Sequence, residues 1–407
     1  MKDKLELSSE LENKLRSHLR SKKPLFGTDS PFSGLLQSMV NTMLEGEMED
    51  HLKQSNKLGK KNKRNGYSNK KVISEEGELY ISTPRDREGS FKPEIIEKRE
   101  RQLSSGLDKQ ILALYAQGNS IEDVRRLLLE LYSVEISAGK ISAITDKVLP
   151  EIQQWRDRQL RSFYPILYLD AIHFKVRHEG KYSSQAFYTA YAVDWEGNRD
   201  LLGMYVSESE GANTWGMVLQ DLKKRGVADV LVVCVDDLTG FSGVIKEEFS
   251  QSIIQKCIVH QIRNSLKYVQ DKEKKKVAGD LKKIYTAATR QAGEDALKVF
   301  DQKWGKKYKY IVEQWTSKWD ELTAFFDFQA PLRRMIYTTN PVEALHRIIR
   351  KLIKGKAAWS SRNALIKQLY LSLMQNKKSW KRKAYNWKSI QLELLNQYPE
   401  RIKPHID

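Results

Sequence analysis

The chain has 407 residues and a formal net charge of +18, from 70 lysines and arginines against 52 aspartates and glutamates. With 40% hydrophobic and 30% charged residues, it has the composition of a globular protein long enough for two or three domains. No apolar run approaches the roughly 18 residues of a membrane span and the start is charged, so the protein is expected in the cytoplasm. Two cysteines, Cys234 and Cys257, give neither a disulfide framework nor a four-ligand zinc site.

The positive charge is concentrated in two stretches. Residues 51–74 hold eight lysines or arginines and no acid, and residues 344–392 hold thirteen and no acid. Aromatic residues are interleaved in the second stretch: Trp359, Tyr370, Trp380, Tyr385 and Trp387. Either stretch alone could be a solvated surface. Two together favour a polyanion partner, most often nucleic acid.

The first hundred residues predict one long helix and one strand. An apolar stripe at helical spacing covers residues 32–52. The polar run Lys53–Lys71, which includes Arg64-Asn-Gly-Tyr67, predicts a loop with a turn. A strand is expected at Glu78–Thr83, followed by a charged loop over Pro84–Gly89.

Three short helices are predicted next. The first covers Asp108–Ala116, the second begins at Ser120, which can form a cap with Asp123, and the third begins near Ser137. Short helices joined by tight turns suit a helix-turn-helix unit in a DNA major groove, and they equally suit three-helix packing without DNA. The basic surroundings favour DNA.

Asp170 is the most informative single residue. The apolar run Ile166–Leu169 predicts a strand buried on both faces. This strand is expected to continue past Asp170 to about Arg177. An isolated carboxylate is costly to desolvate, so it persists in such a place when it is paired or holds a metal. A structural role and a metal-binding role both remain open from this residue alone.

The section after Asp170 predicts the fold class. Strands are expected at residues 186–193, 201–206, 230–235 and 253–259, with helices from Asn213, over residues 242–249 and from His260. The order β-β-β-α-β-α-β-α is that of a ribonuclease H-like α/β fold, a mixed sheet with helices on both sides. There the first and fourth strands are parallel neighbours, so Asp170 and Asp236 would face each other. Divalent cations make such a pair tolerable, and hard oxygen ligands select Mg²⁺ or Mn²⁺.

A third acid follows an all-helical stretch. Asn340 and Pro341 predict a helix start, with Glu343 in its first turn, where an acid could simply compensate the helix dipole. His346, three residues later, could approach the site or DNA phosphates. His173 is three residues after Asp170 and is expected on the opposite strand face.

Several blocks resemble, in order and spacing, transposases of the Mutator type, which in bacteria form the insertion sequence 256 family. Four carry the catalytic motifs: Tyr168–Ile172, Val235–Phe241, Cys257–Asn264 and Thr338–Arg347. Arg64–Tyr67 and Pro84–Arg87 extend the resemblance toward the amino terminus. Ala357-Ala-Trp359 stands where relatives often have a Phe-Pro pair.

The resemblance implies that Asp170, Asp236 and Glu343 are a DDE triad that binds two Mg²⁺ or Mn²⁺ ions. Between Asp236 and Asp237, the family spacing to Gly240 favours Asp236. It also implies that Cys257 and His260 form a Cys-x-x-His signature, whose residues could alternatively be half a zinc site or core residues. Carboxylates with two divalent ions support phosphoryl transfer without a covalent protein intermediate.

The resulting interpretation is a DNA transposase that cleaves 3′ ends and joins them to target DNA. It divides the chain into a basic helical region (1–100), a helix-turn-helix-like DNA-binding region (101–160), the first part of the core (161–262), an all-helical insertion (263–335) and the end of the core with a basic tail (336–407). The expected partners are double-stranded DNA, as terminal inverted repeats and target in the bacterial nucleoid, and further copies in a homodimer or larger assembly. No membrane and no small-molecule substrate is expected.

The cations expected to contact DNA are Lys60, Lys61, Lys63, Arg64, Lys140, Arg263, Arg347, Arg350, Lys351 and Lys354. Two alternatives remain: a non-catalytic DNA-binding repressor derived from a transposase, and a plain metal-dependent nuclease. The complete set of three acids favours catalysis over a repressor, which could lose any of them.

Overall fold

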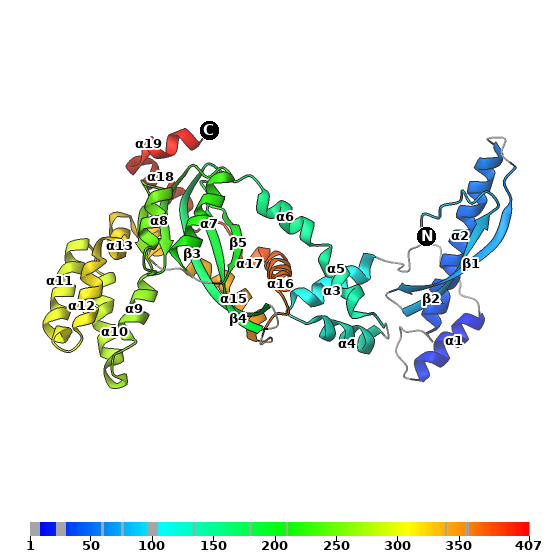
Figure 1. Cartoon of the computed structure of the whole chain (residues 1–407), viewed down its shortest axis with the longest axis horizontal. Helices are drawn as coiled ribbons and strands as arrows, with labels where there is room; N and C mark the ends of the chain where they lie inside the picture. Colours follow the sequence, from blue (N-terminus) through cyan, green and yellow to red (C-terminus); the bar gives the residue numbers. More distant parts are fainter. Residues whose placement is uncertain are drawn as a thin grey trace. The chain divides into compact units, whose positions relative to one another are not determined.

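The computed structural model describes residues 9–21, 30–57, 61–74, 77–96, 105–132, 135–178, 181–208, 211–337, 340–354, 356 and 358–406. The chain forms two compact units, residues 1–148 and residues 149–407 (Figure 1). Within the described ranges, no helix is long and apolar enough to cross a membrane.

The first unit begins with two helices and a hairpin. Helices α1 (Ser9–Arg20) and α2 (Pro31–Lys57) precede strands β1 (Arg64–Ser74) and β2 (Gly77–Asp86), which pair antiparallel. The hairpin packs on α2 through a small apolar cluster of Val40, Leu44, Val72, Leu79, Ile81 and Ile96.

The predicted loop over residues 53–71 is therefore wrong at both ends. Its start continues α2, and β1 begins at Arg64. A strand that exposes most of its side chains lacks the apolar alternation by which strands are recognised. The predicted loop from Pro84 is also wrong in its first residues, because β2 continues to Asp86. The buried Asp86 carboxylate accepts hydrogen bonds from Asn62 Nδ2 and Ser90 Oγ, both at 2.7 Å, and so holds the following turn.

The three predicted helices of the first unit are confirmed as α3 (Ser105–Ala116), α4 (Ile121–Tyr132) and α5 (Ala138–Asp146). At the start of α4, Ser120 Oγ accepts from the Asp123 amide while the Asp123 carboxylate accepts from the Ser120 amide, each at 3.0 Å. Ser137 Oγ accepts from the Lys140 amide at 3.2 Å and caps α5. Helix α5 contacts both α3 and α4, so the three helices form one packed group.

The second unit contains a five-stranded mixed sheet in the order β5-β4-β3-β6-β7. Its strands are β3 (Phe163–His178), β4 (Lys181–Val193), β5 (Arg199–Ser207), β6 (Asp229–Val235) and β7 (Ile253–Lys256). Strand β4 pairs antiparallel with β3 and β5, whereas β6 pairs parallel with β3 and β7. The predicted order of elements is confirmed, as is the expectation that the first and fourth strands are parallel neighbours.

The last predicted strand ends too late. Strand β7 stops at Lys256, and helix α9 (Ile258–Leu266) begins two residues before the predicted start at His260. The Cys257 amide donates to the Val235 carbonyl at 2.8 Å, after which the chain turns into the helix. A short apolar run such as Ile258-Val259 fits a strand or a helix equally well, so periodicity could not place this boundary.

Helices cover both faces of the sheet (Figure 1). Helices α7 (Ala212–Lys224) and α8 (Phe241–Glu248) pack on one face, where Trp215, Leu219 and Phe241 join Leu167 and Leu169 in the main core. Helices α15 (Asn340–Lys354) and α16 (Arg362–Gln375) contact β3. Because side chains alternate along β3, Asp170 is on the face opposite to Leu167 and Leu169. Helix α6 (Leu149–Asp157) precedes the sheet.

Every described element between α9 and α15 is helical. These elements are α10 (Asp271–Tyr285), α11 (Arg290–Phe300), a π-helical turn (Asp301–Gly305), α12 (Lys309–Ser317), α13 (Trp319–Thr323), a 3₁₀ turn (Ala324–Asp327) and α14 (Ala330–Ile336). Gln255 of β7 attaches them to the sheet: its Nε2 donates to the Leu322 carbonyl at 3.0 Å, and its Oε1 accepts from the Phe325 amide at 2.7 Å.

After α15 the chain returns to the sheet. The Trp359 amide donates to the Lys175 carbonyl at 3.0 Å and the Trp359 carbonyl accepts from the Arg177 amide at 2.8 Å, so Trp359 is bonded to β3 on both sides. Helices α17 (Lys377–Trp380), α18 (Trp387–Gln397) and α19 (Pro399–Ile402) and a 3₁₀ turn (Lys403–His405) follow.

Of the five aromatic residues interleaved in the second basic stretch, only Tyr385 is exposed, with 84% of its surface accessible to solvent. The other four are buried, so they are core residues rather than part of a nucleic-acid surface.

Candidate active site

Asp170 and Asp236 lie at corresponding positions of two adjacent parallel strands. Leu169 of β3 is paired in register with Val235 of β6, and each acid is the next residue along its chain. Asp170 remains inside the long strand β3, whereas Asp236 is the first residue after β6. The two strands therefore place the two acids at neighbouring backbone positions of the sheet.

Asp170 is buried and has a histidine partner. Nδ1 of His346 lies 3.2 Å from Oδ2 of Asp170, and both side chains are almost fully buried. Nε2 of His346 lies 3.2 Å from the hydroxyl of Thr189, which donates its proton to the backbone carbonyl of Asp170 at 3.0 Å. Both ring nitrogens of His346 therefore have a polar partner within the core. The expectation that His346 approaches this site agrees with the structure.

Helix α15 brings its first turns to Asp170. It begins at Asn340, with Pro341 at the next position, and Val342, Leu345 and Ile349 are buried. Glu343 belongs to the first turn, but its side chain lies outside the described part of the structure. It precedes His346 by three residues, which is nearly one helical turn.

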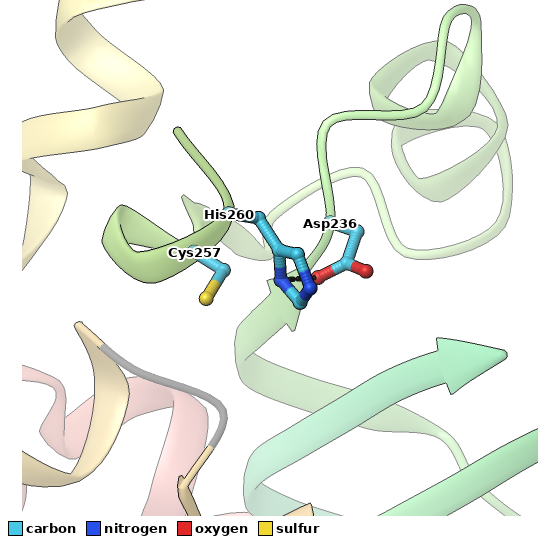
Figure 2. Close-up of side chains that lie close together, drawn as sticks. All are labelled: Asp236, Cys257 and His260. Atoms are coloured by element: carbon cyan, nitrogen blue, oxygen red, sulfur yellow. Dashed lines mark ion pairs between the residues drawn. The ribbon is translucent and has the colours of Figure 1, made fainter. Parts of the chain in front are cut away.

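Asp236 has a second histidine beside it. Nδ1 of His260 is 2.6 Å from Oδ1 of Asp236, and one ligand atom from each of Asp236, Cys257 and His260 lies within 4.8 Å of the others (Figure 2). Asp236, and after it Cys257, raise the pKa of His260 above its ordinary value. The Arg263 guanidinium lies 3.1 Å from the other ring nitrogen, Nε2.

The neighbouring acid, Asp237, has different partners. Lys256 Nζ lies 3.1 Å from its Oδ1, Lys318 Nζ pairs with its Oδ2, and Lys256 also pairs with Glu321 at 2.8 Å. Burial alone would raise the pKa of Asp237, but Lys318 and Lys256 hold it below its ordinary value. This network joins the loop after β6 to the helical insertion, and it occupies both carboxylate oxygens of Asp237.

The cations expected to contact DNA occur in three groups. Lys61, Lys63 and Lys140 of the first unit are exposed, while Lys60 lies outside the described residues. Arg347, Arg350 and Lys351 are exposed at positions i, i+3 and i+4 of α15, and the side chain of Lys354 lies outside the described part. Arg263 is exposed beside His260.

Arg64 differs from these residues because it is already neutralised. Its guanidinium lies 2.5 Å from the Glu45 carboxylate and 3.4 Å from that of Glu49, both on α2.

Several residues around the acids were not singled out from the sequence. Thr189 is a polar residue within the buried run of β4, a signal that could have been noticed. Lys256 ends the apolar strand β7 and is buried, but nothing in the sequence links it to Lys318. His173 is exposed, whereas Asp170 is buried, in agreement with their expected placement on opposite faces.

Known proteins with similar sequences are transposases of insertion sequences. The chain is 36% identical to the transposase for insertion sequence element ISRM3 of Rhizobium meliloti (strain 1021), over 94% of this chain and 96% of that protein. It is 25% identical to the transposase for insertion sequence element IS256 in transposon Tn4001 of Staphylococcus aureus, over 85% and 90% of the two chains. Among solved structures, the Drosophila P element transposase strand transfer complex aligns with 72% of this chain and 86% of that chain at 10% identity, with a TM-score of 0.30.

The family follows from a match over nearly the whole sequence. The profile described as "Transposase, Mutator family" matches residues 8–383. The chain belongs to the Mutator family of transposases.

Proposed function

We propose that this chain is a DDE-type DNA transposase with a ribonuclease H-like core, which binds the terminal inverted repeats of its insertion sequence and catalyses metal-dependent 3′-end cleavage and strand transfer. The observation that carries the proposal is the register of β3 and β6, which delivers Asp170 and Asp236 together while α15 packs against Asp170 through His346. The strand order with its two parallel neighbours and helices on both faces supports the assignment of the core.

The proposed metal ligands are Asp170, Asp236 and Glu343. Two carboxylates delivered to one place repel unless cations lie between them, and oxygen ligands suit Mg²⁺ or Mn²⁺. Asp237 is a poorer candidate than Asp236, because two lysines occupy its oxygens. Glu343 is proposed from its place on α15, one turn before the residue that contacts Asp170.

The protein's own residues would then hold the acids in a defined orientation. His346 and Thr189 fix Asp170 from the α15 side, and His260 contacts one oxygen of Asp236. A pair of divalent ions bound by the three acids would activate the attacking oxygen and stabilise the leaving oxygen of an in-line phosphoryl transfer.

Two phosphoryl transfers make up the proposed reaction. In the first, a water oxygen bonds to the phosphorus that links the element's 3′ end to the flanking nucleotide, while the bond from that phosphorus to the element's 3′ oxygen breaks. This leaves a 3′-hydroxyl on the element and a 5′-phosphate on the flanking DNA. In the second, the freed 3′-hydroxyl bonds to a target-strand phosphorus and displaces a 3′ oxygen of the target. Helix α15 starts at the site and exposes three cations, Arg347, Arg350 and Lys351. These side chains can bind phosphates of the DNA strands that react there.

Recognition of the ends is proposed for the first unit. Helices α3 to α5 form a packed group, and α5 presents the exposed Lys140 in its first turn, as a recognition helix in a major groove would. Because two element ends must be joined to one target, the working form is proposed to be a homodimer or larger assembly. The protein is proposed to act on its DNA substrates in the bacterial nucleoid.

The test is a strand-transfer assay with purified protein, Mg²⁺ or Mn²⁺, and labelled DNA that ends in the inverted repeat of the element. Joined products should form with the unmodified chain and disappear with Glu343→Gln, while binding to the ends persists. Cleavage without joining would indicate a nuclease. Tight, specific binding with neither reaction in either metal would indicate a repressor.

A further inference from the structure

We propose that Asp236, Cys257 and His260 form a zinc site, and that zinc bound there inhibits the transposase because it takes Asp236 from the catalytic set. The inhibitory part rests on the proposed function, which gives Asp236 its role. The zinc site itself rests only on the three side chains and their surroundings.

The three donors converge from two elements that are fixed to each other. Asp236 follows β6, while Cys257 and His260 stand at the start of α9. The Cys257 amide donates to the Val235 carbonyl at 2.8 Å, so the residue before Asp236 is bonded to the residue that begins α9. Carboxylate oxygen, thiol sulfur and imidazole nitrogen all lie within 4.8 Å of one another (Figure 2). Donors around one tetrahedral zinc are about 3–4 Å apart, so a small side-chain adjustment closes the site.

The chemistry of the donors selects zinc over magnesium. Mg²⁺ takes oxygen ligands and retains water, so a thiolate and an imidazole serve it poorly. One sulfur, one nitrogen and one oxygen ligand suit Zn²⁺, and three protein ligands leave a fourth position for water or a phosphate oxygen. The same cluster therefore does not duplicate the proposed magnesium site, although the two share Asp236.

The site is accessible to an ion on one side. Cys257 is buried, whereas the side chains of Asp236 and His260 are 32% and 27% exposed. The 2.6 Å contact between His260 Nδ1 and Asp236 Oδ1 shows both groups directed at one point. Because zinc takes deprotonated ligands, its binding there would displace any proton carried by the His260 nitrogen or the Cys257 sulfur that binds it.

Metal binding by the full-length protein, without DNA, tests the site directly. Titration with Co²⁺ in place of zinc should produce the thiolate-to-cobalt charge-transfer band, and added Zn²⁺ should abolish it with one equivalent per chain. The band should be absent in Cys257→Ser and retained in Cys234→Ala, which alters the other cysteine, buried in β6. Zinc affinity should fall at least about 100-fold in Cys257→Ser and in His260→Gln, since loss of an outer partner alone often costs 10–100-fold.

Inhibition is measured separately, as zinc titration of Mg²⁺-supported cleavage, with each protein normalised to its own rate without zinc. The unmodified chain should lose cleavage at the zinc concentration that fills the site, and Cys257→Ser should require at least about tenfold more. A missing cobalt band, or zinc affinity unchanged in both variants, overturns the proposed site. Equal zinc sensitivity of the unmodified chain and Cys257→Ser overturns the inhibition. Failure of cleavage with Mg²⁺ alone would instead count against the proposed function, and the cobalt spectrum would still decide the zinc site.

Discussion

His346 of α15 and Asp170 of β3 form a buried pair, with Nδ1 3.2 Å from Oδ2, and Thr189 closes the arrangement on the other ring nitrogen. His346→Ala should lower the free energy of unfolding by about 2–4 kcal/mol, because it leaves a buried carboxylate without its partner. Metal-dependent cleavage should fall about 10–100-fold, as expected when a partner of a metal ligand is lost. Denaturant unfolding and the cleavage assay measure the two effects.

Asp170→Asn provides the control for this pair. If His346 acts through the Asp170 carboxylate, the protein with both substitutions should be more stable than the sum of the two single losses predicts. The expected coupling energy is about 1–3 kcal/mol. Additive effects would mean that His346 is merely a buried residue of α15.

Asp236 and Asp237 should respond in opposite ways to the same substitution. Asp236→Asn should abolish cleavage. Asp237→Asn should lower the free energy of unfolding by about 2–4 kcal/mol, because Lys256 and Lys318 lose the carboxylate between them, while some cleavage remains. The reverse pattern would assign the metal to Asp237.

The stabilising effect of Asp237 should also depend on pH in a defined direction. Its pKa is lowered in the folded chain, so its contribution is present at neutral pH and is lost as pH falls below about 4 and through the lowered folded value. The difference in unfolding free energy between the unmodified chain and Asp237→Asn should therefore shrink on acidification. If this difference in unfolding free energy stays constant from pH 7 to about pH 3, the ion pairs of Asp237 with Lys256 and Lys318 are not its cause.

The exposed cations of α15 should contribute to the salt dependence of DNA binding. Replacement of Arg347, Arg350 and Lys351 by glutamine should reduce the slope of log affinity against log salt by about 2–3, near one for each lost phosphate contact. Arg64→Gln is the matched control, because Glu45 and Glu49 already neutralise Arg64 and the slope should change little. Equal slopes for all proteins would show that the α15 cations are only solvated.

Residues 1–148 should carry the recognition of element ends. A protein that begins at residue 149 keeps the whole mixed sheet and both acids, and it forms one compact unit. It should bind inverted-repeat DNA and unrelated DNA with equal affinity, as measured by competition at fixed salt. Retained preference for the repeat would locate recognition in the second unit.

The order of helices and strands in the second unit was predictable because buried strands appear in the sequence as continuous apolar runs. Val230–Val235 and Ile166–Leu169 are two such runs, and an acid inside a buried strand drew attention to Asp170. An acid after a strand is common, so Asp236 was selected by the expected pairing of the first and fourth strands and by the family resemblance. The family resemblance then supplied Glu343. Strand β1 was missed because a largely exposed, lysine-rich strand has no such pattern, and its pairing with β2 stabilises it instead.

The partners of the acids could not be predicted in the same way. Lys256 meets Asp237 because β7 pairs with β6, and Lys318 meets it because the insertion docks on β7. No local pattern in the sequence encodes either contact. The aromatic residues near the carboxyl terminus were misleading for a related reason. Trp359, Trp380 and Trp387 pack into the core through contacts distant in sequence, although their basic neighbours suggested a nucleic-acid surface.

The contact between Asp170 and His346 also has a consequence for the order in which the site forms during synthesis. The ribosome completes β3 and β6 long before it reaches α15, so a growing chain carries both aspartates while it lacks His346 and Glu343. A product that terminates within the helical insertion has no third acid and leaves Asp170 without its histidine. Under the proposed function, DNA cutting would thus be withheld from unfinished or prematurely terminated chains.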